Sequence, residues 1–244
     1  MDVAEFAVNS SARPSVRQVG RERTPVLVID SLTQNCDAFI NYACHEARFT
    51  LDETSGYPGV RAPLPQDYAT AVLGALYPLL QQIYTVPPDH KMWPVNAVFS
   101  LVCTPEAQLR VLQSLPHFDS ARRYYFAMTH YLNPGDFGGT ALYRHRPTGF
   151  ENVTQDRLDT YVQAGDQYLT EHGDPRPGYF GDSDGHYRRI DQVDWMPNRL
   201  VAYPGSLLHS GLVQPSRDLS DDPRTGRLTA NLFVCFQPES AELH

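Results

Sequence analysis

Apolar and polar residues alternate in short runs along most of the chain and recur at helical spacing in a few places. The stretch 65–84 has apolar residues three and four positions apart, as a helix with one buried face requires. Further helices are expected over 32–47, after a strand over 24–30, and over 154–173. Alternating runs predict many short strands from residue 95 onward. These strands cover 95–103, 116–120, 123–132, 139–146, 199–205, 206–213 and 227–237.

Helices followed by many strands predict a mainly β member of the α+β class, whose core is a sandwich or barrel. No internal repeat or low-complexity linker divides the chain, so we expect a single domain over 1–244. Residues up to about 94 would support a strand-rich core over 95–237. The polar, glycine-rich stretch 150–194 is expected to be an insertion in that core.

Composition narrows the class of protein further. A hydrophobic fraction of 41% with 20% charged residues is typical of a globular protein with a substantial core. Apolar runs are too short to span a bilayer, and the N-terminus lacks a signal-peptide pattern, so we expect a cytoplasmic protein without membrane partners. A net charge of −8 argues against nucleic acid as the main partner, because phosphate binding needs a basic surface.

The four cysteines are widely spaced and form no CxxC pair. This spacing argues against a structural zinc site or a thioredoxin-like motif. Cys103 and Cys235 lie in apolar runs and are expected to be buried thiols.

The sequence HFD contains a candidate pair of metal ligands. On a strand, His117 and Asp119 point to the same face. The motif alone is weak, and its second copy, 172–174, lies in a turn-like stretch that we interpret as a surface loop. His209 follows a Pro-Gly turn and would complete a two-histidine, one-carboxylate triad with open positions for ligands and oxygen. The alternatives are a hydrogen-bonded pair on a solvated strand and a core histidine.

Arg227 begins an otherwise apolar strand, where a guanidinium without an anionic partner is costly. It can hold a carboxylate through two hydrogen bonds, and the hydroxyl of Thr229 faces the same way. An iron enzyme that uses 2-oxoglutarate needs such a group for the far carboxylate of the oxoacid. The alternative is a structural ion pair with a buried acid.

Several motifs in order resemble the iron(II)/2-oxoglutarate-dependent dioxygenases. They are HFD, YYFAMTHYLNPGDFGGTALY, PGSLLHSG and GRLTANLFV. The likeness to the prolyl-4-hydroxylase-like branch covers about 95–237, and the closer likeness, to the bacterial DUF6445 set, extends over the whole chain. It implies a double-stranded β-helix (jelly roll, cupin-like) with flanking N-terminal helices. It also implies that His117, Asp119 and His209 bind Fe(II), that Arg227 binds the distal carboxylate of 2-oxoglutarate, and that Tyr131 hydrogen-bonds it. Tyr131 is otherwise interpreted as a packing aromatic.

The resemblance implies hydroxylation by O2, with 2-oxoglutarate converted to succinate and CO2. Asp119 argues against halogenation, because related halogenases have a small residue there. Two features depart from the family pattern. The 17 residues between His209 and Arg227 are more than prolyl hydroxylases usually have. Arg224 is therefore the alternative to Arg227 as the receptor for the 2-oxoglutarate carboxylate. The stretch 150–194 is not required by the family core.

Other residues near these motifs have two interpretations. Arg144 and Arg146 would share a strand face, either as contacts for an acidic substrate or as a solvated strand end. His130 is interpreted as structural, because it should face away from Tyr131. Aromatic residues of 150–194 would form a lid over the substrate or anchor the insertion.

The expected substrate is a small molecule such as an amino acid or natural-product intermediate, with a peptide as the other possibility. Two rival functions remain. One is a cupin-like metal oxygenase or isomerase that does not use 2-oxoglutarate. The other is a catalytically silent jelly-roll module that binds a ligand or a partner protein. The oligomeric state is left open.

Overall fold

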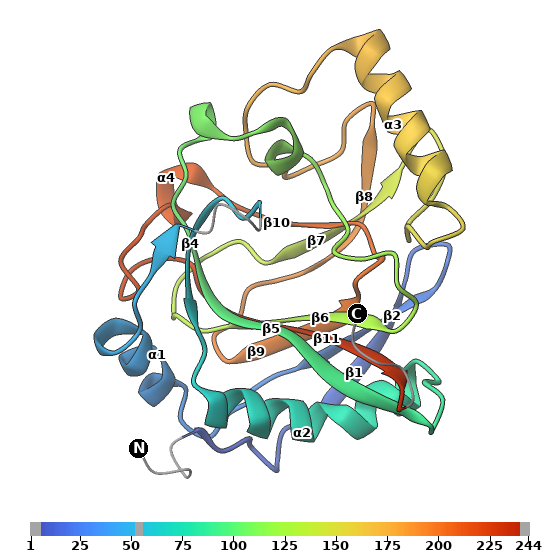
Figure 1. Ribbon diagram of the computed structural model, residues 1–244. Coiled ribbons are helices and arrows are strands. Elements are labelled where there is room, and N and C mark those ends of the chain that lie inside the picture. Colours follow the sequence, from blue (N-terminus) through green and yellow to red (C-terminus); the bar gives the residue numbers. More distant parts are fainter. Residues whose placement is uncertain (1–5, 52–55, 240–244) are drawn as a thin grey trace.

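The computed structural model describes residues 6–51 and 56–239, which form two antiparallel sheets and several helices (Figure 1). The α-helices are α1 (Cys36–His45), α2 (Gln66–Ile83), α3 (Leu158–His172) and α4 (Pro215–Asp218), with 3-10 turns at Glu106–Gln108 and Val111–Ser114. The large sheet has the order β1 (Pro14–Val19), β2 (Thr24–Ile29), β9 (Arg199–Pro204), β6 (Tyr125–Tyr131), β11 (Leu228–Pro238), β5 (His90–Val102), β4 (Gly59–Pro63), β3 (Thr50–Leu51). The small sheet has the order β10 (His209–Gly211), β7 (Thr140–His145), β8 (Tyr187–Val193).

The two faces of the large sheet differ in character because side chains alternate along each strand. On β11, Leu228, Ala230 and Leu232 belong to the main hydrophobic core. The alternate residues Thr229 and Asn231 line a cavity on the other face. In Figure 1, α2 lies along the first face and the small sheet lies on the opposite side.

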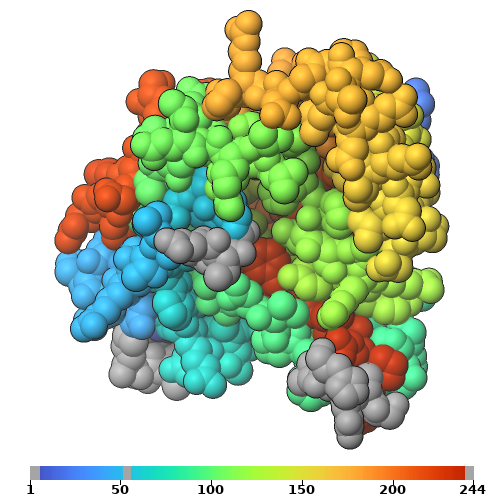
Figure 2. All heavy atoms as spheres, turned by 45° about the horizontal axis from the view of Figure 1, so that its top comes forward, coloured from blue at the N-terminus to red at the C-terminus, as the bar shows by residue number. Residues whose placement is uncertain are grey.

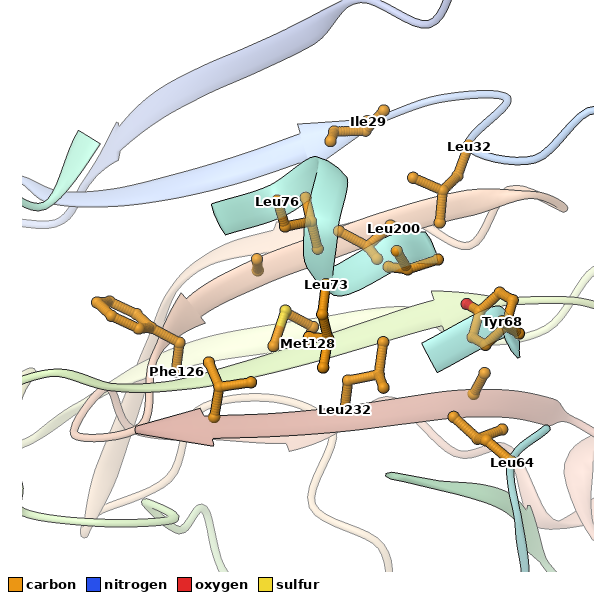
Figure 3. Close-up of a cluster of buried hydrophobic side chains, with 14 of the residues drawn as sticks. Ile29, Leu32, Leu64, Tyr68, Leu73, Leu76, Phe126, Met128, Leu200 and Leu232 are labelled. Atoms are coloured by element: carbon orange, nitrogen blue, oxygen red, sulfur yellow. The ribbon is translucent and has the colours of Figure 1, made fainter. Parts of the chain in front are cut away.

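Helix α2 covers the core face because its apolar residues recur every three or four positions. Its buried side chains are Tyr68, Val72, Leu73, Leu76 and Leu80. Figure 3 shows Leu73 and Leu76 of this helix beside Met128 and Leu200 of the sheet. None of the helices in the described part of the chain is long and apolar enough to cross a membrane.

His130 lies on the same helix-facing side of the large sheet. Its ring is fully buried, with Nδ1 2.8 Å from the Tyr68 hydroxyl and Nε2 3.0 Å from Oδ1 of Asn198. Asn198 also binds the backbone of Thr33. His130 therefore ties the sheet to α2 and lies away from the cavity.

The stretch 150–194 contributes to the sheet architecture more than the sequence indicated. It contains α3 as expected, but also β8, which pairs with β7 along the small sheet. Part of the stretch that we expect to be an insertion thus forms an edge strand of the small sheet. Its sequence, YRRIDQV, is polar enough for a strand at a sheet edge, and this polarity concealed it.

Other expectations about strands need correction. Residues 116–120 form no regular strand, and only His117 makes a bridge. The predicted strand 206–213 shrinks to His209–Gly211. Hydrogen-bonded ladders in the described residues do not join the two sheets into a closed barrel.

All four cysteines are free thiols. Cys235 is buried, whereas Cys103 is only partly buried, at the point where β5 ends. The expectation of two buried thiols is therefore wrong for Cys103.

Candidate metal centre and anion pocket

A cavity of about 720 Å³ lies on the face of the large sheet that is not covered by α2. Strands β6 and β11 contribute Thr129, Thr229 and Asn231, while Arg61 and Arg110 come from other walls. Figure 2 shows the surface hollowed where red C-terminal atoms lie deep between green and yellow-green segments. A cavity of this size can hold a small molecule in addition to a five-carbon diacid.

Backbone hydrogen bonds place HFD against the turn that precedes β10. The amides and carbonyls of His117 and His209 bind each other reciprocally, at 2.9 and 2.8 Å. The Asp119 amide donates to the Gly205 carbonyl at 2.7 Å. Gly205 is required there because a Cβ would lie 2.5 Å from the Tyr125 ring. Segments 85 residues apart or more in sequence thus hold their side chains together.

The side chains of His117, Asp119 and His209 converge on one point of the cavity. Their potential ligand atoms all lie within 4.8 Å of one another. Nε2 of His209 is 3.6 Å from Oδ2 of Asp119, and the side chains of these two residues are 8% and 16% exposed. Oδ2 of Asp119 is buried and has no hydrogen-bond partner. Two imidazoles and one orphaned carboxylate oxygen fit a divalent transition metal ion.

The surroundings keep both imidazoles ready to bind a metal. Burial, with contributions from His209 and Arg61, lowers the pKa of His117 to about 4. Burial also lowers the pKa of His209 to about 4 and raises the pKa of Asp119. At neutral pH the two rings are therefore uncharged, with free lone pairs. A bound cation would offset the cost of ionising Asp119.

The orientation of His209 is set by its own turn. Its Nδ1 lies 2.9 Å from the Leu207 carbonyl, which can only accept a hydrogen bond. Nδ1 therefore carries the proton, and Nε2 presents its lone pair toward Asp119. The Tyr203 ring packs on His209 at 4.8 Å between centroids. Such supporting contacts fix the direction of metal ligands.

Arg227 is buried and lines the same cavity. Its Nε donates to the Gly138 carbonyl at 2.8 Å, and one terminal nitrogen donates to the Gly139 carbonyl at 2.9 Å. The guanidinium carbon lies 5.1 Å from the ring centroid of Trp195. No carboxylate of the described residues pairs with Arg227, so its charge is available to an anion in the cavity.

Tyr131 and Thr229 occupy neighbouring strands beside Arg227 and are paired in register. The Tyr131 hydroxyl is buried and lies 2.7 Å from the hydroxyl of Thr140, which lines the cavity. Thr229 lines the cavity itself and accepts a 2.9 Å hydrogen bond from Asn231. Tyr131 is therefore connected to the pocket by its hydrogen bond to Thr140, whereas Thr229 is itself part of the pocket wall.

The structure places three other candidate residues outside the cavity lining. Arg224 pairs with Asp222 at 3.4 Å near the surface, so it does not replace Arg227 in the pocket. Arg144 forms an ion pair with the buried Glu151. Arg146 is exposed. Neither Arg144 nor Arg146 is among the residues that line the cavity with the metal ligands.

The cavity also includes residues that the sequence did not single out as site residues. Tyr57, Arg61 and Arg110 lie in or beside short segments with no clear periodicity, so their common location depends on tertiary structure. Tyr179, from 150–194, lines the cavity and donates to the Thr104 carbonyl at 2.6 Å. One aromatic residue of that stretch therefore covers the site, while Phe180 packs against Tyr143.

Comparisons with known proteins identify the family. The model of DUF6445, a family of unknown function, matches residues 10–234, so the chain belongs to this family. No curated protein matches the chain.

Solved structures show weak overall similarity. AviO1 from Streptomyces viridochromogenes Tue57 is 10% identical, with a TM-score of 0.43 over 99% of this chain and 95% of its own. HygX from Streptomyces hygroscopicus, with nickel, 2-oxoglutarate and hygromycin B bound, is 13% identical, with a TM-score of 0.45 over 89% and 87%. An N-substituted L-amino acid dioxygenase from Burkholderia ambifaria AMMD is 11% identical, with a TM-score of 0.39 over 92% and 94%.

Proposed function

We propose that the protein is a non-haem iron(II)- and 2-oxoglutarate-dependent oxygenase that hydroxylates a small molecule. The single observation that carries this proposal is the convergence of the His117, Asp119 and His209 ligand atoms in a cavity that also contains an unpaired Arg227. A metal triad and a buried carboxylate receptor are the two parts that this chemistry requires. We further infer that the two facing sheets are those of a double-stranded β-helix.

Each residue of the site has a separate task in this proposal. His117, Asp119 and His209 would hold Fe(II) and leave positions open for ligands. Arg227, fixed by the carbonyls of Gly138 and Gly139, would bind the distal carboxylate of 2-oxoglutarate. When iron is bound, the chemistry supplied is activation of O2 coupled to conversion of 2-oxoglutarate to succinate and CO2.

The rest of the pocket orients ligands and limits their contact with water. Thr229 faces the same volume as Arg227 and offers a hydroxyl to a carboxylate. Trp195 stacks on Tyr131 at 4.7 Å and lies beneath the guanidinium of Arg227. These rings exclude solvent behind the carboxylate receptor and so strengthen its interaction with an anion.

The test is calorimetric titration of the metal-free protein under argon with Mn(II), and then with 2-oxoglutarate. We expect Mn(II) to bind first and 2-oxoglutarate to bind only to the Mn(II)-loaded protein. His117→Ala should abolish both steps, because it removes a ligand. Arg227→Gln should retain Mn(II) binding and weaken 2-oxoglutarate binding at least tenfold, since a charge-assisted carboxylate contact is lost.

The matched control is His172→Ala, which alters the exposed histidine of the second His-x-Asp motif and should change neither step. Mn(II) binding with no effect of 2-oxoglutarate would instead favour a cupin-like metal enzyme. No metal binding at all would leave a catalytically silent binding module. Succinate formed from 2-oxoglutarate in the Fe(II)-loaded enzyme in air is the corresponding activity.

A further inference from the structure

The charged residues that line the cavity are mostly basic, although the chain as a whole is acidic. The chain carries −8, yet the charged side chains among the described lining residues are Arg61, Arg110, Arg227 and one acid, Asp119. Among the described residues, an acidic protein thus surrounds a cavity with more basic than acidic side chains, and such a cavity concentrates anions.

The metal and cosubstrate of the proposed function would not neutralise all of this charge. The two charges of the ion and the one of Arg227 would be balanced by Asp119 and by the two carboxylates of 2-oxoglutarate. The charge of Arg110 then remains in the part of the cavity left for the substrate. Arg61 is held at the wall by Tyr57, whose ring centroid lies 4.5 Å from the guanidinium carbon.

Arg110 is the most accessible of these cations. It directly precedes the 3-10 turn Val111–Ser114 and reaches toward the opposite wall at Gly56, where a Cβ would lie 3.8 Å from its terminal nitrogen. Arg110 makes no ion pair with any residue in the described part of the chain, and its side chain is exposed. Its donors are therefore available to a ligand that enters the cavity.

The remaining rim around Arg110 is apolar and aromatic. Leu112, in the same 3-10 turn, is 78% exposed, and Phe118 and Tyr179 line the cavity nearby in the fold. The Phe118 ring packs edge-on against Tyr161 at 5.8 Å, so it is held in place by the 150–194 stretch. This rim suits the apolar body of a ligand whose charged group reaches Arg110.

We infer that the substrate is a small organic anion with an apolar body, and that Arg110 binds its carboxylate while the metal site acts on the body. This inference rests on the proposed function, because it assigns a substrate class to that site. Arg110 is therefore a specificity-determining residue, distinct from the cosubstrate receptor Arg227.

The test compares acids with their uncharged amides in the protein loaded with Mn(II) and 2-oxoglutarate under argon. The probes are butyrate, hexanoate and 3-phenylpropionate, each against its primary amide, with binding measured by calorimetry. We expect at least one acid to bind about tenfold or more tightly than its amide, as a charged hydrogen bond provides. Arg110→Gln should remove this preference and leave the affinities for Mn(II) and 2-oxoglutarate unchanged, whereas Arg110→Lys should retain part of it.

The matched control is Arg146→Gln, which removes the same charge from an exposed position outside the cavity and should keep the preference. If no acid binds more tightly than its amide, or if Arg110→Gln keeps the difference, the inference is overturned while the proposed function stands. If Mn(II) and 2-oxoglutarate themselves fail to bind, the proposed function fails, and the inference fails with it.

Discussion

At the scale of single residues, the carboxylates of Asp119 and Asp218 are in opposite situations. Oδ2 of Asp119 is buried without a hydrogen bond. Asp218 is fully buried but accepts hydrogen bonds from the Gly138 and Gln214 amides and from Arg217. A buried charge without partners costs folding free energy, whereas a fully satisfied one does not carry that penalty. The unsatisfied oxygen of Asp119 therefore costs folding free energy, which a cation at the proposed metal site would offset.

Replacement of Asp by Asn should therefore have opposite effects on the free energy of unfolding at positions 119 and 218. Asp119→Asn should raise the free energy of unfolding of the metal-free protein by about 1 kcal/mol, because it removes an uncompensated charge, and should abolish Mn(II) binding. Asp218→Asn should lower the free energy of unfolding, because an acceptor is replaced by a donor opposite N–H groups. Urea unfolding in the presence of a chelator measures both. Destabilisation by Asp119→Asn would show that this carboxylate has a structural role.

The proposed ligand residues could be predicted from the sequence because short spacing and chain order carry that information. His117 and Asp119 are two residues apart, and His209 follows a recognisable Pro-Gly turn. Their convergence within 4.8 Å is visible in the structure. Arg61 and Arg110 could not be singled out, because their segments come together only through the pairing of β4 with β5 and the path of the 3-10 turns.

At the scale of elements, the Gly138–Gly139 pair determines how Arg227 is presented. A Cβ at Gly138 would overlap the Leu212 carbonyl, and one at Gly139 would overlap the Val193 carbonyl. The pair thus fits closely between the segments after β10 and β8, with both of its own carbonyls directed at Arg227. This close approach explains the two successive glycines, whose φ angles are not positive.

Gly138→Ala should therefore weaken the cosubstrate pocket selectively. The displaced backbone would remove an acceptor from Arg227, so we expect the dissociation constant of 2-oxoglutarate to rise about tenfold. Mn(II) affinity should change less, because the clash falls at Leu212, three residues beyond the proposed ligand His209. Calorimetry on the Mn(II)-loaded protein measures this. Gly165→Ala is the control, because no atom lies within 4 Å of its added Cβ. Equal loss of Mn(II) affinity would mean general unfolding instead.

The contact between β6 and α2 through His130 introduces a pH dependence of stability. Burial lowers the pKa of His130 from its ordinary value of 6.5 to about 4. Between these values the unfolded chain binds a proton that the folded protein does not. The neutral His130 therefore contributes up to about 3 kcal/mol to the free energy of unfolding above pH 6.5. This contribution is lost as the pH falls toward 4.

Substitution of His130 separates its contribution to the pH dependence of stability from the contributions of the other buried histidines. His130→Gln should be less stable than the parent protein at pH 7, because the Tyr68 and Asn198 hydrogen bonds are altered, but its stability should change less between pH 7 and pH 5. Urea unfolding at both pH values gives the two differences. His172→Gln, at an exposed helix end, should keep the parent slope, and an unchanged slope in His130→Gln would exclude this mechanism.

Elements with strong periodicity could be predicted, and weakly patterned ones could not. Helix α2 was expected at 65–84 and lies at Gln66–Ile83, because its apolar face alone specifies it. Strand β8 was missed, because an edge strand that exposes Arg188 has no clean alternation. The same applies to β4, whose five residues include a glycine and a proline.

At the scale of the whole molecule, the proposed ligands would connect the two sheets. His209 begins β10 of the small sheet, while Arg227 directly precedes β11 of the large sheet. Between them lies the cavity, and no hydrogen-bonded ladder crosses it in the described residues. A metal ion alone would therefore tie β10 to the 117–119 segment. Addition of 2-oxoglutarate, bound at the metal and at Arg227, would link that unit to β11.

This arrangement predicts a stepwise change in hydrogen exchange measured under argon. Mn(II) alone should slow amide exchange in 117–119 and β10. Further addition of 2-oxoglutarate should slow exchange at Gly138, Gly139 and the start of β11. At a ligand concentration 100 times its dissociation constant, openings that release the ligand become about a hundredfold rarer. Arg227→Gln should lose the second step and keep the first. If both steps appeared with Mn(II) alone, the sheets would already be coupled without the cosubstrate, and Arg227 would have no bridging role.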